Sequence, residues 1–284
     1  MPASPATVLC VCTSNVCRSP AAELLLRAGL RRRLGERAAR AVEISSAGIW
    51  ASDGMPVEPG TAKALRAHGV TTADLVAARS TPLRREAVVA ADLVIASAAE
   101  HVRGVWRLQI TARYRTFTLG ELAVLARTID PATLPPPAGP DPAGRSDGAD
   151  RSEPAGPTMV SGAAALLAPA RLGPPPAPYA EAPADTATGP ADRLRALVRA
   201  ASTMREARRL PDAPYVTDAY DLADPADDDL TQRDMVEETA LHIGVLLDLL
   251  AGPAPARRPA RDRVRWPAWA VEWTRSRARR GASR

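Results

Sequence analysis

Cysteine is scarce in this chain of 284 residues, and its three cysteines all lie before residue 18. This distribution excludes a disulfide-stabilised scaffold and leaves no distant cysteine pair for a zinc site. The longest apolar run near the start, Val8–Val11, is far shorter than the roughly 20 residues of a membrane span. Aromatic residues make up only 4%, although the 46% share of hydrophobic residues permits an ordinary core. We therefore expect a soluble, cytoplasmic protein without a membrane span.

Basic residues are concentrated at one end. The formal net charge is +5, yet Arg257–Arg284 alone carries a net +8, so the remaining residues sum to −3. The high isoelectric point therefore belongs to a basic tail, residues 252–284, that also contains Trp266, Trp269 and Trp273. Basic residues interleaved with aromatics suit docking to an acidic protein, an anionic membrane surface or nucleic acid. A solvated extension without a partner is the competing interpretation.

Composition divides the rest of the chain into three parts. Residues 1–129 alternate short apolar runs with amphipathic stretches, and a helical pattern resumes over 191–251. Between them, residues 130–190 hold fifteen of the 28 prolines, which block helix interiors, so we expect a disordered insertion there. Alternation of strands and helices predicts an α/β fold with a mainly parallel sheet. Its four strands are expected at 8–12, 41–46, 93–96 and 114–118.

The most informative stretch is Cys12–Pro20, in which five residues separate a Cys from an Arg and a Ser follows. It joins the first predicted strand to a helix with Pro20 in its first turn. A loop of this length can point successive backbone N–H groups inward at a helix N-terminus, which makes an anion cradle. The planar guanidinium of Arg18 matches two oxygens of a tetrahedral oxyanion. Cys12 lies at the floor, where positive potential favours its thiolate, a nucleophile for phosphoryl transfer.

Other residues of this stretch complete the predicted site. The backbone amides of residues 13–18 form the cradle, and the Ser19 hydroxyl donates a hydrogen bond to the sulfur of Cys12. Cys10 is interpreted as a small buried hydrophobe. His68, His101 and His242 lie on separate predicted helices without ligand spacing, so we expect no metal and no cofactor. The phosphate-binding residues predicted around Cys12 and Arg18 are Thr13, Ser14, Asn15, Val16, Cys17 and Ser19.

Cys12–Pro20, followed by Ala21-Ala22-Glu23, resembles the signature of the low-molecular-weight protein tyrosine phosphatases. Weaker likenesses follow in the same order over 46–48, 54–70, 91–95 and 115–122. The resemblance covers roughly 1–129 and 191–251 and implies one phosphatase domain around a four-stranded parallel sheet flanked by helices. It also implies metal-free hydrolysis of phosphotyrosine on a protein substrate, through a cysteinyl-phosphate intermediate.

The family resemblance further implies a general acid, an Asp immediately before Pro on a late loop. Asp224-Pro225 lies where the family would have it, and Asp221 is the reserve candidate. Such a carboxylic acid protonates the leaving group, and its carboxylate then activates water. By the same resemblance, Cys17 could protect Cys12 through a reversible disulfide, with helix packing as the alternative. Trp50 is the candidate for an aromatic wall against a phosphotyrosine ring.

Four departures from the family pattern stand beside this interpretation. Ser14 replaces a Gly and is expected to have a strained or left-handed backbone. A His that often buttresses the loop Asn is missing, and Asp74 lies near its place. Ser97-Ala98 replaces a Met, and Asp227–Asp229 stands where aromatics follow the acid. They are compatible with weak activity or an atypical substrate. Two alternatives stay open: an arsenate reductase that uses an external thiol, since no Cys follows Cys17, and a phosphate-binding module without turnover.

Overall fold

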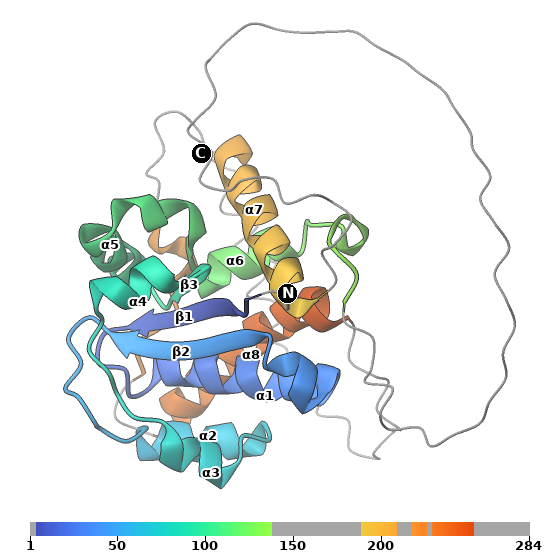
Figure 1. Ribbon diagram of the computed structural model, residues 1–284. Coiled ribbons are helices and arrows are strands. Elements are labelled where there is room, and N and C mark those ends of the chain that lie inside the picture. Colours follow the sequence, from blue (N-terminus) through green and yellow to red (C-terminus); the bar gives the residue numbers. More distant parts are fainter. Residues whose placement is uncertain (1–3, 138–188, 209–216, 226–228, 253–284) are drawn as a thin grey trace, which may run out of the picture. The chain divides into compact units, whose positions relative to one another are not determined.

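The computed structural model describes residues 4–137, 189–208, 217–225 and 229–252 (Figure 1). The predicted basic tail lies outside the described residues, and so does most of the predicted insertion. No helix in the described ranges is both long and apolar enough to span a bilayer.

A parallel sheet runs through the middle of the described part of the chain. Its four strands are β1 (Ala6–Cys12), β2 (Val42–Gly48), β3 (Leu93–Ala96) and β4 (Thr116–Thr118), in the order β2-β1-β3-β4. Every pairing is parallel, which confirms the predicted fold class. β4 begins two residues later than predicted because Ile110–Arg115 forms a 3-10 helix, η1. The Thr116 hydroxyl donates to the Ala112 carbonyl oxygen and fixes this junction.

Helices cover both faces of the sheet (Figure 1). Alternate side chains of β1 point to opposite faces, as strand geometry requires: Val8 and Cys10 belong to the larger core cluster, Leu9 and Val11 to the smaller. The larger cluster is covered by α1 (Arg18–Ala39), α6 (Leu119–Ala126), α7 (Pro190–Arg208) and α8 (Asp229–Ala251). The smaller is covered by α4 (Arg85–Ala90) and α5 (Ala99–Leu108).

Two short helices, α2 (Pro59–Ala67) and α3 (Thr72–Ala77), lie beside α1. The Glu58 carboxylate caps α2 by accepting hydrogen bonds from the amides of Gly60 and Thr61, and Pro59 occupies the first helical position. Gly69, with φ of 82°, follows the end of α2 and has the left-handed backbone of a glycine helix cap.

The folded part extends further than the composition indicated. Pro131–Thr133 forms a 3-10 helix, η2, and Leu134 is buried. The buried Arg193 on α7 donates hydrogen bonds to the carbonyl oxygens of Leu134 and Leu249, which attaches this segment to α8. Residues 130–137 therefore belong to the fold, whereas we predicted that the insertion begins at 130. The composition did not reveal this because the backbone carbonyl groups of the segment, and not its side chains, bind the buried guanidinium. Residues 138–188 lie outside the described residues.

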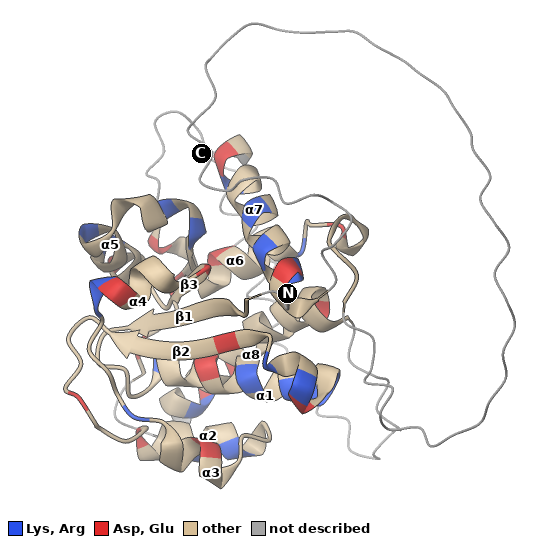
Figure 2. Cartoon of the chain, viewed as in Figure 1, with Lys and Arg blue, Asp and Glu red and all other residues tan. Residues whose placement is uncertain are grey.

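Charged residues lie mainly on the helices and loops (Figure 2). In the four strands of the described sheet, Glu43 is the one charged residue. A parallel sheet buried on both faces has this composition because an unpaired charge in its interior is costly. The chemistry of the molecule must therefore lie where the strands end. The carboxyl ends of the central strands, β1 and β3, lead into the Cys12 loop and the start of α5.

Candidate active site

The loop after β1 has the shape of a cradle. β1 ends at Cys12 and α1 begins at Arg18. Within it, the amide N–H of Asn15 turns back and lies 3.3 Å from the Cys12 sulfur. Neighbouring segments hold the loop by its outward carbonyl groups: the amides of Trp50 and Glu58 donate to the carbonyl oxygens of Thr13 and Val16, at 2.8 and 3.0 Å. The backbone is therefore fixed from outside, and its N–H groups are left for the concave side.

The strain predicted for Ser14 occurs one residue later. Asn15, with φ of 58°, is the one non-glycine residue of positive φ in the described ranges, so the expectation for Ser14 was wrong. Asn tolerates this left-handed region because its short polar side chain can hydrogen-bond locally. Here that side chain is saturated, since Nδ2 donates to Ser19 Oγ and Ser46 Oγ, and Oδ1 accepts from the amide of Thr81.

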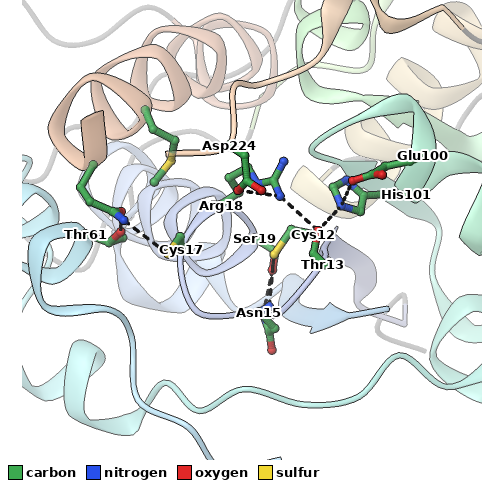
Figure 3. A network of polar contacts seen from close by, with 12 residues as sticks. Cys12, Thr13, Asn15, Cys17, Arg18, Ser19, Thr61, Glu100, His101 and Asp224 are labelled. Carbon is green, nitrogen blue, oxygen red and sulfur yellow. Dashed lines mark hydrogen bonds and ion pairs between the residues drawn. The ribbon is translucent and has the colours of Figure 1, made fainter. Parts of the chain in front are cut away.

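Cys12 lies at the floor of the cradle and is almost fully buried. Its sulfur is 3.0 Å from the Ser19 hydroxyl, which lies in the first turn of α1 (Figure 3). The amide of Asn15, the hydroxyl of Ser19 and the N-terminus of α1 all direct positive charge at this sulfur. Burial raises the pKa of the Cys10 thiol well above its ordinary value, which suits the packing role expected for it.

A buried carboxyl group supports the loop Asn through Ser46. Ser46 Oγ donates to Glu23 Oε2 at 2.5 Å and accepts from Asn15 Nδ2 at 2.9 Å. Arg27 donates in turn to Glu23. Burial raises the pKa of Glu23, while the hydrogen bond from Ser46 and the charge of Arg27 oppose that rise. Asp74, the residue expected near the missing His, instead forms an ion pair with Arg31.

Arg18 lies at the rim of the cradle with a nearly buried side chain. One nitrogen, Nη2, has two partners: Asp224 Oδ1 at 2.8 Å and Thr13 Oγ1 at 3.1 Å (Figure 3). The Asp224 side chain is 75% exposed, so this ion pair is open to water and easily exchanged. The structure thus brings Cys12 and Arg18 of the loop after β1 together with Asp224, which lies more than 200 residues later in the chain.

The loop before Asp224 is attached to the start of α5. The Asp221 carboxylate accepts a hydrogen bond from the amide of Ala99 at 2.7 Å, and the amide of Leu222 donates to the carbonyl oxygen of Ser97 at 2.8 Å. Burial raises the pKa of Asp221. Asp221, our reserve candidate for the acid, is therefore engaged as a helix cap, whereas Asp224 faces Arg18. Residues 226–228 and the side chain of Asp229 lie outside the described residues.

Two further predicted site residues are Trp50 and Cys17. Trp50 has an exposed fraction of 79%, and its amide donates to the carbonyl oxygen of Thr13. Cys17 is half-buried and points toward α2 and α8, where the Gln232 amide lies 3.8 Å from its sulfur (Figure 3). Both Cys12 and Cys17 are free thiols in this structure, and burial raises the pKa of Cys17. The predicted reversible disulfide stays a prediction.

The comparisons with known proteins agree with this geometry. A family model described as low molecular weight phosphotyrosine protein phosphatase matches residues 7–130. The chain is 32% identical over 116 residues to a probable low molecular weight protein-tyrosine-phosphatase, EpsP, of Ralstonia solanacearum, covering 41% of this chain and 72% of that protein. The chain belongs to the low molecular weight protein-tyrosine-phosphatase family. Its members named here are phosphatases, which does not favour the arsenate reductase or the turnover-free binding module.

Other relatives of this phosphatase differ in their named substrate. It is 32% identical over 114 residues to a protein-arginine-phosphatase of Bacillus subtilis, with 40% of this chain and 70% of that protein covered. A solved low molecular weight protein tyrosine phosphatase of T. tengcongensis is 32% identical to this chain and has a TM-score of 0.37. The match covers 42% of this chain and 76% of that structure's chain. The family thus fixes the reaction as phosphatase chemistry and leaves the phosphorylated side chain to be argued separately.

Sequence reasoning missed one residue at this site, His101 on α5. We considered it only as a metal ligand, and no cluster of His, Cys, Asp and Glu suited to a metal ion occurs in the described ranges. Its imidazole is buried, with Nε2 2.9 Å from Thr13 Oγ1 and 3.3 Å from Glu100 Oε1. No local motif announces this contact, because 88 residues separate His101 from Thr13. The pairing of β1 with β3 brings them together.

Proposed function

We propose that this phosphatase hydrolyses phosphotyrosine on protein substrates, with Cys12 as nucleophile, Arg18 as phosphoryl ligand and Asp224 as general acid and base. The observation that carries the proposal is the position of the Cys12 sulfur. It lies 3.0 Å from the Ser19 hydroxyl and 3.3 Å from the Asn15 amide, beneath the buried guanidinium of Arg18. Hydrogen-bond donors around a sulfur at a helix N-terminus are the surroundings in which a cysteine attacks a bound phosphoryl group.

The proposed reaction has two balanced steps. In the first, the thiolate of Cys12 attacks phosphorus, the bond from phosphorus to the ester oxygen breaks, and protonated Asp224 gives its proton to that oxygen. In the second, water attacks the phosphocysteine, its proton goes to the Asp224 carboxylate, and the sulfur leaves as a thiolate that Ser19 stabilises. Arg18 and the amides of residues 13–18 neutralise the charge that develops on the phosphoryl oxygens.

Substrate entry requires a change at Arg18. Its Nη2 donates to Asp224 in this structure, so a phosphoryl oxygen must take the place of that carboxylate. Released from Arg18, Asp224 can face the leaving group from the exposed side. We include Thr13, Ser14, Asn15, Val16, Cys17 and Ser19 in the phosphate-binding loop and Trp50 as the aromatic wall. The exposure of Trp50 supports that role, because a ring must be accessible to stack on a substrate.

Hydrolysis of para-nitrophenyl phosphate tests this proposal directly. Wild type should release para-nitrophenolate without added metal, Cys12→Ser should abolish release, and Asp224→Ala should lower it while shifting the pH–rate profile. A reaction that survives Cys12→Ser would refute the assignment of the nucleophile. Metal-dependent turnover would refute the cofactor-free mechanism.

Phosphoarginine is a second candidate substrate. A relative at the same 32% identity is named a protein-arginine-phosphatase. Asp224 contacts Arg18, and further acidic side chains belong to the same loop and to the start of α5: burial raises the pKa of Asp221, and the charges of Asp218 and Glu100 add to that rise. A guanidine leaving group becomes cationic when protonated and suits such surroundings. Parallel assays on a phosphotyrosine peptide and a phosphoarginine peptide decide between them by the ratio of kcat/KM.

We also propose a cytoplasmic, bacterial setting. The relatives named above are bacterial, and a nucleophilic Cys12 needs the reducing conditions that keep thiols free. Fractionation of cells that produce the protein tests this. Docking of the basic tail, 252–284, to a polyanion stays a prediction from the sequence alone: deletion of residues 255–284 should abolish salt-sensitive retention on heparin, and unchanged retention would contradict it.

A further inference from the structure

The contact between His101 and the phosphate loop has no part in the mechanism above. His101 lies in the first turn of α5 and its side chain is 1% exposed. Its Nε2 is 2.9 Å from Thr13 Oγ1, and the same Oγ1 accepts a hydrogen bond from Arg18 Nη2 at 3.1 Å (Figure 3). The His101 imidazole, the Thr13 hydroxyl and the Arg18 guanidinium therefore form a continuous chain of polar contacts.

The hydrogen positions in this chain follow from its partners. Glu100 Oε1 lies 3.3 Å from His101 Nε2, whereas Nδ1 has no hydrogen-bond partner within the described ranges. A proton on Nε2 can be donated to both Thr13 and Glu100 and leaves only an acceptor unpaired. A proton on Nδ1 would bury an unused donor and turn a lone pair toward the carboxylate, which is the costlier arrangement. His101 is therefore the donor to Thr13.

The Thr13 hydroxyl then has one remaining function. Its oxygen already accepts hydrogen bonds from His101 and Arg18, which occupy its two lone pairs. Its single hydrogen is consequently left to be donated to a third group. A phosphoryl oxygen held by Arg18 is an acceptor within reach of that hydrogen.

We propose that His101 is a positioning residue for phosphate binding: by donating to Thr13, it turns the Thr13 hydroxyl into a donor to the phosphoryl group and steadies Arg18. The inference rests on the proposed function, since it assigns a contact to the same cradle. It also explains how Arg18 stays in place during binding. Of the two partners of Nη2, Asp224 must leave and Thr13 remains.

The charge state of His101 agrees with this role. Burial and the nearby charge of Arg18 lower the pKa of His101 to about 4, so the ring is neutral at physiological pH. A neutral imidazole has a single N–H, and the contacts above place it on Nε2. A cationic ring at this point would repel Arg18 and carry a second buried donor without a partner.

Binding of inorganic phosphate, measured by isothermal titration calorimetry, tests the proposal without relying on turnover. His101→Leu and Thr13→Val should each weaken phosphate binding roughly tenfold, the scale of one hydrogen bond to a charged group. His101→Gln, whose amide nitrogen can donate to Thr13, should keep binding within about threefold of wild type. The double variant should bind no worse than either single variant, because both remove the same contact.

A matched control separates positioning from packing. His242 on α8 is another neutral histidine; it is half-buried, its Nδ1 has no partner within the described ranges, and it lies near Arg127 instead of the cradle. His242→Leu should lower thermal stability about as much as His101→Leu and leave phosphate binding unchanged. Additive effects of His101→Leu and Thr13→Val, or a His101→Gln variant no better than His101→Leu, would overturn the inference. Wild type that binds phosphate without hydrolysing para-nitrophenyl phosphate would instead refute the proposed function alone.

Discussion

Gly120 determines where the loop that carries Asp224 can lie. It is the second residue of α6, and a Cβ at this position would lie 2.7 Å from the carbonyl oxygen of Tyr220 and 3.3 Å from its Cβ. The nearest of these atoms is backbone, so no side-chain rotation can relieve the contact. Gly120→Ala therefore forces the chain at Tyr220 to retreat by roughly 0.5–1 Å, the gap to an ordinary carbon–oxygen separation. Asp224 follows four residues later.

This shift should act on proton donation and spare the nucleophile. Misplacement of a catalytic group by about 1 Å costs on the order of 100-fold in rate. Phenyl phosphate has a poor leaving group that needs the proton of Asp224, whereas para-nitrophenolate leaves readily without it. We expect kcat/KM of Gly120→Ala to fall about 10- to 100-fold on phenyl phosphate and less than about tenfold on para-nitrophenyl phosphate.

The assay compares kcat/KM, because that ratio reports the steps up to release of the phenol and excludes hydrolysis of the phosphocysteine. Gly244→Ala is the matched control, since a Cβ there meets no atom within 4 Å. It should keep both activities and stabilise α8 slightly, because Ala favours a helix over Gly by about 1 kcal/mol. Equal losses on the two substrates in Gly120→Ala, or no loss on phenyl phosphate, would refute the link between Tyr220 and the acid.

Three other substitutions test separate parts of the site. Gly48→Ala should nearly abolish turnover and cost about 1–3 kcal/mol of stability, seen by thermal unfolding, since its Cβ would lie 2.6 Å from the Thr13 carbonyl oxygen. Ser46→Ala should lower the free energy of unfolding by about 1–3 kcal/mol and slow turnover, because an Asn15 amide hydrogen loses its acceptor. Burial lowers the pKa of His242 to about 4, so the stability contributed by its neutral ring is complete above pH 6.5 and is lost as the pH falls from 6.5 through 4. His242→Gln cannot take up this proton, and urea titrations should show that it removes up to about 3 kcal/mol of that loss.

The approximate positions of the strands could be predicted because each is a short apolar run between turn residues, and their parallel direction because helical stretches alternate with them. β3 was predicted at its observed bounds, Leu93–Ala96. β4 was not, because Tyr114 and Arg115 have the composition of a strand yet form the end of η1. The hydrogen bond from Thr116 to Ala112 decides that boundary, and such a contact leaves no periodic pattern in the sequence.

The phosphate loop could be placed from the sequence, whereas its strain could not be assigned to a residue. Because Ser14 replaces a Gly, we expected Ser14 to have the left-handed backbone, but the left-handed residue is Asn15. Its conformation depends on three side-chain hydrogen bonds to Ser19, Ser46 and Thr81, which offset a cost of about 1–3 kcal/mol. Two of those partners are distant in sequence. Only the folded chain brings Ser46 and Thr81 to Asn15, so an argument from the residue type at one position assigns the strain to the wrong residue.

The two hydroxyl groups beside the nucleophile are controlled from outside the loop in the same way. Glu23 accepts the hydrogen of Ser46, so the Ser46 oxygen must accept from Asn15, and the other Asn15 amide hydrogen goes to Ser19. The hydrogen of Ser19 then remains for the Cys12 sulfur at 3.0 Å, with the Ala47 carbonyl oxygen at 3.3 Å as its competitor. The short distance to sulfur and the negative charge of a thiolate favour Cys12 as its acceptor. A buried carboxyl group thus acts on Ser19, through Ser46 and Asn15, in the same sense as His101 acts on Thr13. Each leads to a hydrogen bond donated to the hydroxyl oxygen, so that the hydroxyl hydrogen is left to be donated within the site.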